Sequence, residues 1–183
     1  MVIDSVKQIL AEFKPAGWGK DLVAAGFVRS VERHEQTLAI TLVLPFAGQS
    51  LFEQIKETFD AHIRAATGAA IVDWQCDIEV ASMPRAQQLA AVQGIRNILV
   101  VASGKGGVGK STTAVNLALA LQKEGARVAI LDADIYGPSI PTMMGTLKER
   151  PHSLDGKLME PVMACGLKTN SIGYLVAEQD ATI

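Results

Sequence analysis

The chain has 183 residues, of which 49% are hydrophobic and 20% are charged, and its formal net charge is −2 at pH 7. These values are ordinary for a soluble globular protein, and they give no charge excess that would draw the chain to nucleic acid or to anionic lipid. The two distant cysteines exclude a disulfide framework and suit the cytoplasm, the N-terminus has no signal-peptide pattern, and no apolar run approaches the roughly 20 residues of a membrane span.

The first third of the chain predicts a helix followed by two strands. Residues 4–13 carry apolar side chains at helical spacing, and a proline and two glycines then break the pattern. Residues 27–34 and 37–46 are predicted strands. In the second strand, one face carries alternating apolar side chains: Leu38, Ile40, Leu42 and Leu44.

A second helix and a third strand complete the predicted N-terminal domain. Residues 50–68 have the pattern of an amphipathic helix that Gly68 ends, and residues 69–80 that of a strand. The order helix, strand, strand, helix, strand predicts a small α+β domain over residues 1–82.

The rest of the chain predicts the beginning of a doubly wound α/β domain. Residues 83–95 have the composition of a linker, and the second domain is expected over residues 96–183. There, residues 97–103 and 127–134 are predicted buried strands, joined by a predicted helix over residues 111–125. Strand, helix and strand make one βαβ unit.

A glycine-rich loop lies between the first of these strands and the helix. Its sequence, GKGGVGKS, fits the pattern G-x-x-x-x-G-K-[ST], in which backbone N–H groups and the helix N-terminus surround phosphates. Lys110 would reach the β- and γ-phosphates of ATP, and the Ser111 hydroxyl would ligate Mg²⁺. The predicted nucleotide-binding residues are Gly104, Lys105, Gly106, Gly107, Val108, Gly109, Lys110, Ser111 and Thr112.

Two carboxylates follow the second predicted strand of this domain. Asp132 and Asp134 stand at its carboxyl end, where ligands bind in open α/β sheets, and their spacing points them the same way on an extended chain. We expect Asp134 to be catalytic, orienting water, and Asp132 to support it near Mg²⁺. The alternative is that the run VAILD is a Walker B strand with Asp132 at its end.

Lys105 is a second lysine within the loop. A lysine at this place resembles the deviant Walker A loop of the family of nitrogenase iron protein and MinD. The resemblance implies that Lys105 is catalytic across a homodimer interface, much as an arginine finger acts in trans. It also implies that Asp134 is the switch aspartate of that family. The alternative for Lys105 is a solvated loop lysine.

The run from Gly94 to Gly145, above all DADIYGPSIP, resembles the Mrp/ApbC branch of iron–sulfur cluster carrier ATPases. The N-terminal domain is similar to the MIP-type domain fused ahead of that ATPase. The resemblance implies an ATP-hydrolysing homodimer that passes iron–sulfur clusters to apoproteins, without nucleic-acid or membrane partners. One departure is the acidic motif after the first helix, of which the chain keeps only Asp21.

A second departure is the absence of the C-x-x-C pair that holds the cluster in this family. Cys76 and Cys165 are expected to be buried packing residues, so the iron–sulfur ligands are expected outside this chain. We therefore expect an N-terminal fragment, inactive alone. Two other readings remain: a MinD/ParA-type positioning ATPase that cycles on membrane or DNA, and a non-catalytic adaptor module.

Overall fold

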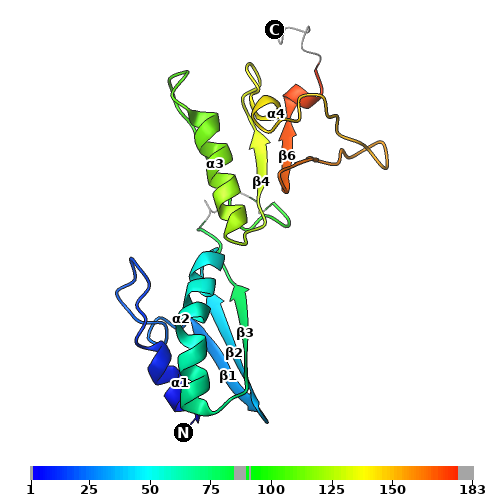
Figure 1. Cartoon of the computed structure of the whole chain (residues 1–183). Coiled ribbons are helices and arrows are strands. Elements are labelled where there is room, and N and C mark those ends of the chain that lie inside the picture. The colour runs from blue at the N-terminus through cyan, green and yellow to red at the C-terminus, as the bar shows by residue number, and fades with distance from the viewer. Residues whose placement is uncertain (1, 85–89, 91, 177–183) are drawn as a thin grey trace. The chain divides into compact units, whose positions relative to one another are not determined.

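The computed structural model describes residues 2–84, 90 and 92–176. The chain divides into two compact units, Met1–Arg96 and Asn97–Ile183. Each unit has its own sheet (Figure 1). The linker predicted over residues 83–95 falls partly on residues 85–89 and 91, which lie outside the described residues.

The N-terminal unit is a three-stranded sheet with two helices on one face (Figure 1). In chain order its elements are α1 (Val2–Leu10), β1 (Val28–His34), β2 (Thr37–Leu44), α2 (Gln49–Thr67) and β3 (Ile71–Ile78). The strand order is β1-β2-β3, in which β1 and β2 are antiparallel and β2 and β3 are parallel. The order of elements predicted from the sequence is confirmed.

The core of this unit lies between β2 and the helices. The four alternating residues of β2 are fully buried, because they share the face that α2 covers: Leu38, Ile40, Leu42 and Leu44. From α2, the side chains of Phe52, Ile55, Phe59 and Ile63 pack into the same core. Gly68 ends α2 in the left-handed conformation, with φ 68°, and donates its N–H to the Arg64 carbonyl, as the sequence predicted.

The C-terminal unit contains α3 (Lys110–Lys123), β4 (Ala129–Asp132), α4 (Ile140–Met143), β5 (Val162–Ala164), β6 (Leu167–Ser171) and the 3₁₀ turn η1 (Ile172–Tyr174). Its sheet has the order β4-β6-β5, with β4 parallel to β6 and β5 antiparallel to it. Helix α3 lies beside β4 (Figure 1). The predicted fold class, an α+β N-terminal domain followed by the first part of a P-loop α/β domain, is confirmed.

The prediction of a buried strand over residues 97–103 is wrong. These residues form no strand, and Val100 is 82% exposed. The physical reason is that a strand needs neighbours for its N–H and C=O groups and a layer on each face. Among the described residues no strand pairs with this run. The predicted βαβ unit therefore lacks its first strand.

The second predicted strand forms as β4, but it is not buried on both faces. Ile130 packs toward α3 and is buried, whereas Leu131 points away and is 75% exposed. The partner of β4 is β6, which belongs to a hairpin that the sequence analysis did not predict. Alternating buried residues in β5 and β6 were the available signal: Val162, Ala164, Leu167, Thr169 and Ser171.

Candidate functional site: the glycine loop before α3

The glycine-rich loop reaches α3 through two residues with positive φ. Gly107 has φ 72° and Gly109, the N-cap of α3, has φ 88°. L-residues rarely adopt this conformation, so glycine is needed at both positions. No side chain caps the first turn of α3, which leaves its N–H groups to an anionic ligand.

The loop borders a hollow of about 340 Å³ that also reaches the next helix. Its lining from the loop and α3 consists of Lys105, Gly107, Val108, Gly109, Lys110, Ser111 and Thr112. Ser139 and Met143 complete the lining from the start and end of α4. The sequence analysis missed these two residues, since nothing in their spacing ties them to the glycine loop.

Lys110 is the first residue of α3, and its ammonium is paired with a carboxylate. Its Nζ donates to Asp134 Oδ2 at 3.1 Å. Both side chains are partly exposed. The structure therefore brings together two residues that the sequence analysis assigned to the same site: the loop lysine and the aspartate after β4.

Asp132 ends β4 and accepts three hydrogen bonds. Its Oδ1 accepts from the Asp134 backbone N–H at 3.2 Å, and its Oδ2 accepts from the Ile140 N–H at 3.2 Å and the Ser171 hydroxyl at 3.0 Å. One carboxylate thus fastens both ends of the loop between β4 and α4. Ser171 has no place in the sequence analysis, because 39 residues separate it from Asp132.

Lys105 lies in an exposed turn of the loop. The Ser103 hydroxyl accepts from the Lys105 N–H and donates to the Lys105 carbonyl, both at 3.1 Å. This small ring fixes the backbone and leaves the lysine side chain exposed. In the described part of the chain, its ammonium has no ion-pair partner.

The lining suits a nucleotide phosphate chain with Mg²⁺. A Cβ added at Gly104, Gly106, Gly107 or Gly109 would meet nothing within 4 Å, so the backbone faces open space there. Lys110 supplies positive charge, and the Ser111 and Thr112 hydroxyls supply oxygen ligands at the same hollow. Cation, hydroxyls and bare backbone N–H groups are the donors that a magnesium-bound polyphosphate requires.

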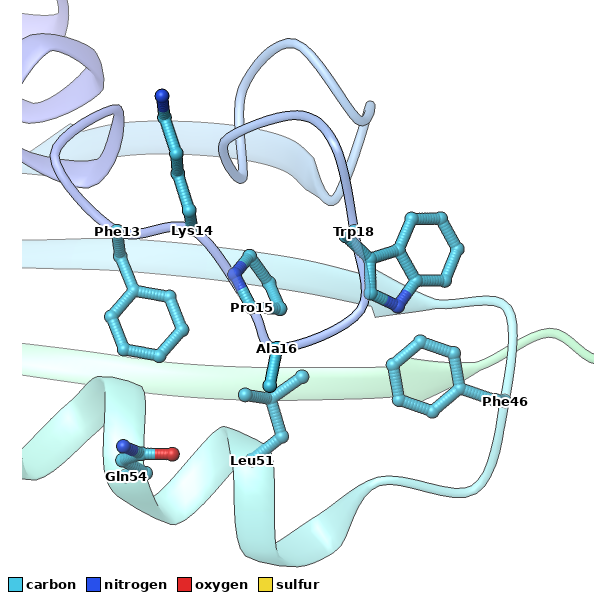
Figure 2. Close-up of a pocket in the computed structure, with 8 residues that line it drawn as sticks. All are labelled: Phe13, Lys14, Pro15, Ala16, Trp18, Phe46, Leu51 and Gln54. Atoms are coloured by element: carbon cyan, nitrogen blue, oxygen red, sulfur yellow. The ribbon is translucent and has the colours of Figure 1, made fainter.

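A second hollow lies in the N-terminal unit. Figure 2 shows it beside the segment that follows α1, with Trp18 and Phe46 at one end and Phe13 at the other. Trp18 is 40% exposed, stacks on Phe46 with ring centroids 5.6 Å apart and meets Phe27 edge-on at 4.8 Å. The indole of Trp18 therefore packs against two other aromatic rings and is partly exposed.

Asp21, the one acidic residue kept near the family's acidic motif, has a local structural role. Its Oδ1 accepts from the N–H groups of Ala24 and Val23, each at 2.9 Å. These hydrogen bonds hold the pKa of the Asp21 carboxyl below its usual value, and the bond from Ala24 has the larger effect. Asp21 therefore caps the turn that leads into Phe27 and β1.

The two cysteines differ from each other. Cys76 is half-buried against the core on β3, and burial, followed by the charge of Asp77, raises the pKa of its thiol. Cys165 is exposed at the β5–β6 turn with φ 49°, so the prediction that it is buried is wrong. The signal for this turn was Gly166 directly after it, because glycine readily adopts the positive φ that a two-residue hairpin turn requires.

The described residues contain no group of three or more His, Cys, Asp or Glu side chains that could hold a metal ion. Among them, no helix has the length and apolar character to cross a membrane.

Two protein families match this chain, and each matches mainly the part of the chain that contains one of its two sheets. Residues 94–183 match the family described as NUBPL iron-transfer P-loop NTPase. Residues 4–74 match a family described as iron-sulfur cluster assembly protein.

Curated relatives match most of the chain. The iron-sulfur cluster carrier protein of Escherichia coli (strain K12) is 48% identical over 174 residues, which are 95% of this chain and 47% of the relative. The proteins of the same name from Haemophilus influenzae and Synechocystis sp. are 47% and 36% identical, over 98% and 96% of this chain and 49% and 51% of the relatives. The chain spans about half the length of the curated relatives it matches.

A nucleotide-binding protein from Archaeoglobus fulgidus, solved in complex with ADP, shares 48% identity over 41% of this chain and 31% of its own, with a TM-score of 0.39. The two family matches lie one after the other along one polypeptide and agree with the glycine loop and the fold class. Residues 94–183 therefore belong to the iron-transfer P-loop NTPase family, and residues 4–74, which precede them, belong to the iron-sulfur cluster assembly protein family.

Proposed function

We propose that the protein binds and hydrolyses ATP with Mg²⁺ at the loop Gly104–Thr112 and, as a cytoplasmic homodimer, transfers iron–sulfur clusters to apoproteins. The activity is proposed for a polypeptide of the relatives' length, with the cluster held by residues outside this chain. The observation that carries the nucleotide part is the hollow that Lys110, Ser111 and Thr112 line, with Asp134 in contact with Lys110. The names of the relatives support the cluster part.

The residues divide the proposed chemistry among them. The loop N–H groups and Lys110 bind and orient the phosphates, and Ser111 holds Mg²⁺, which supplies charge neutralisation on the phosphate oxygens. Asp134 lies within hydrogen-bond distance of Lys110, and we assign it to orienting the attacking water. Asp132 supports it through the Asp134 backbone N–H.

Lys105 has a separate place in the proposal. Its backbone is fixed by Ser103, and its exposed side chain has no described ion pair, which suits a cation offered to a partner subunit. A cation delivered in trans makes hydrolysis depend on dimerisation, as an arginine finger does.

Replacing Lys110 tests nucleotide binding. Lys110→Ala should weaken ATP binding roughly 10- to 100-fold, because it removes a charge-assisted hydrogen bond to the phosphates. Lys123→Ala is the matched control: it removes the same charge from the last turn of the same helix. Titration calorimetry measures the affinity of both variants for ATP. Equal affinities would show that the glycine loop is not the nucleotide-binding site.

Mixed dimers test Lys105. Lys105→Ala should leave ATP affinity nearly unchanged and lower turnover in the full-length protein. Mixing it with Asp134→Asn subunits should restore part of the phosphate release, since each could complete one composite site. Mixtures no more active than either parent would show that Lys105 does not act in trans.

Cluster transfer needs its own assay. Anaerobic reconstitution of the full-length protein with iron and sulfide, followed by mixing with an apo-ferredoxin, should give a holo-ferredoxin spectrum. No transfer from a protein that binds ATP normally would refute the carrier role and leave the nucleotide assignment standing.

A further inference from the structure

The carboxyl ends of β4 and β6 lie side by side, and their last residues are in contact. Asp132 and Ser171 are partners in the parallel register, and the Ser171 hydroxyl donates to Asp132 Oδ2 at 3.0 Å. Ser171 is only 2% exposed, so the serine end of this bond is shielded from water.

The hydroxyl of Ser171 has one orientation in this arrangement. Its oxygen accepts the Gly173 N–H at 3.1 Å, which leaves its single O–H to point at Asp132. Because η1 begins at the next residue, the turn of the chain at Ile172–Tyr174 fixes the serine rotamer. Ser171 is therefore a fixed donor.

Asp132, held in place by Ser171, in turn holds the loop that follows β4. Its Oδ1 holds the Asp134 N–H, and its Oδ2 holds the N–H of Ile140, the first residue of α4. Asp134 in turn contacts Lys110 of the glycine loop. A short series of hydrogen bonds thus runs from Ser171 through one carboxylate to the residue that we assign to the attacking water.

The segment around Ser171 also touches the same loop by packing. A Cβ added at Gly173 would lie 3.1 Å from Pro141 Cγ and 3.3 Å from Pro138 Cβ. The room for a side chain at Gly173 is therefore small, because the turn after β6 lies close to Pro138 and to Pro141 of α4. The hydrogen bond to Asp132 and this close packing both hold the loop and α4 to the end of β6.

We infer that Ser171 is a positioning residue for ATP hydrolysis: it fixes Asp132, and through it the loop that carries Asp134. The inference rests on the proposed function for its effect on turnover, whereas its effect on the loop is independent of any reaction. Ser171 is not one of the residues that line the hollow, so its loss should change hydrolysis without changing nucleotide affinity.

The test compares Ser171→Ala with Asn170→Ala, an exposed neighbour on the same strand, and with Ser171→Thr, which keeps the hydroxyl. The first readout is amide hydrogen exchange at Asp134 and Ile140, the two N–H groups that Asp132 accepts. Ser171→Ala should speed both about tenfold, since loss of a hydrogen bond to a charged group costs that order of stability. Ser171→Thr should restore slow exchange, and Asn170→Ala should leave it unchanged.

The second readout separates positioning from a general structural role. In the full-length protein, Ser171→Ala should lower the kcat of ATP hydrolysis about tenfold and change the Kd for ATP less than twofold. Unchanged exchange at Asp134 and Ile140, or a kcat equal to that of Asn170→Ala, would overturn the inference. If the wild-type protein neither binds nor hydrolyses ATP, the proposed function fails, and the exchange rates still decide whether Ser171 holds the loop.

Discussion

Asp132 and Asp134 lie two residues apart, and their side chains have different surroundings. Asp132 accepts three hydrogen bonds from Asp134, Ile140 and Ser171, so its oxygens are committed to the protein. Asp134 reaches across to Lys110, and its side chain is 40% exposed. The sequence placed both at the carboxyl end of a strand, and only the fold separates the carboxylate that holds the loop from the one that faces the lysine.

The Lys110–Asp134 pair predicts a gain of affinity on mutation. Phosphate and Asp134 compete for the same ammonium, so Asp134→Asn should tighten ADP binding about two- to fivefold when Mg²⁺ is chelated, because a partly exposed ion pair contributes up to about 1 kcal/mol. Chelation removes any part that Asp134 plays through the metal. Glu149→Gln, an exposed residue of the same unit, controls for the change in net charge. Weaker ADP binding by Asp134→Asn would mean that the pair does not compete with phosphate.

The β5–β6 turn predicts a stabilising substitution. Cys165 and Gly166 have φ 49° and 78°, both in the left-handed region, which costs an ordinary L-residue about 1 kcal/mol and costs asparagine less. Cys165→Asn should therefore raise the unfolding temperature of the C-terminal unit by a few degrees, as calorimetry would record. Cys165→Ala also removes the thiol but has no left-handed preference, and it should give no increase. A similar rise in both variants would assign the effect to the lost sulfur.

At the scale of elements, patterns that a nearby partner completes were predictable from the sequence. The alternation in β2 and the apolar stripe of α2 are each covered within the same eighty residues, and both formed as predicted. The run at 97–103 is as apolar as β2, yet it forms no strand. Composition reports the tendency of a segment to be buried, whereas a strand also requires a neighbour, which no local pattern supplies.

The same distinction holds at the candidate site. The glycine loop, Lys110 and the two aspartates could be named because phosphate binding demands a local spacing of residue types. Ser139, Met143 and Ser171 could not, since they reach the site through tertiary packing and have no spacing of their own.

The turn that Asp21 caps predicts a dependence on pH. The pKa of Asp21 is lowered in the folded chain, so its contribution to stability is complete above the ordinary carboxyl value of 3.8 and is lost as the pH falls through the lowered folded value. Asp21→Asn should remove that part of the acid dependence. Denaturant unfolding of the N-terminal unit, followed by Trp18 and Trp74 fluorescence, should show a constant stability difference between wild type and variant above pH 3.8, and the two should converge as the pH falls through the lowered pKa of Asp21. A constant difference down to the lowest pH would exclude the cap as its source.

At the scale of the whole molecule, the two units differ in how completely their apolar residues are covered. Among the described residues, the N-terminal unit packs seventeen buried apolar residues into one core, whereas the C-terminal core cluster has seven. Large apolar side chains of the C-terminal unit remain exposed, among them Ile98, Leu99, Val100 and Leu131. Since burial of apolar area is the main stabilising term, the units should differ in stability.

This difference predicts two unfolding transitions in this chain. Hydrogen exchange resolved along the sequence should show strong protection in β2 and α2 and weak protection in β4 and α3, with the C-terminal unit opening first. The dye ANS should bind to the C-terminal unit, because the apolar surface of that unit is accessible. One cooperative transition with equal protection in both units would contradict the prediction.

The positions of the three donors along the chain set the order in which the hydrogen bonds of Asp132 can form during synthesis. The donors stand 2, 8 and 39 residues from Asp132 in the sequence, so the loop after β4 receives its last hydrogen bond only when β6 is in place. During synthesis at about 5–20 residues per second, the glycine loop, α3 and β4 leave the ribosome seconds before Ser171 does. The nascent chain therefore has the glycine loop before it has the anchor for Asp134, the residue that we assign to the attacking water. In the proposed function, an ability to bind nucleotide should then precede an ability to hydrolyse it as the protein is made.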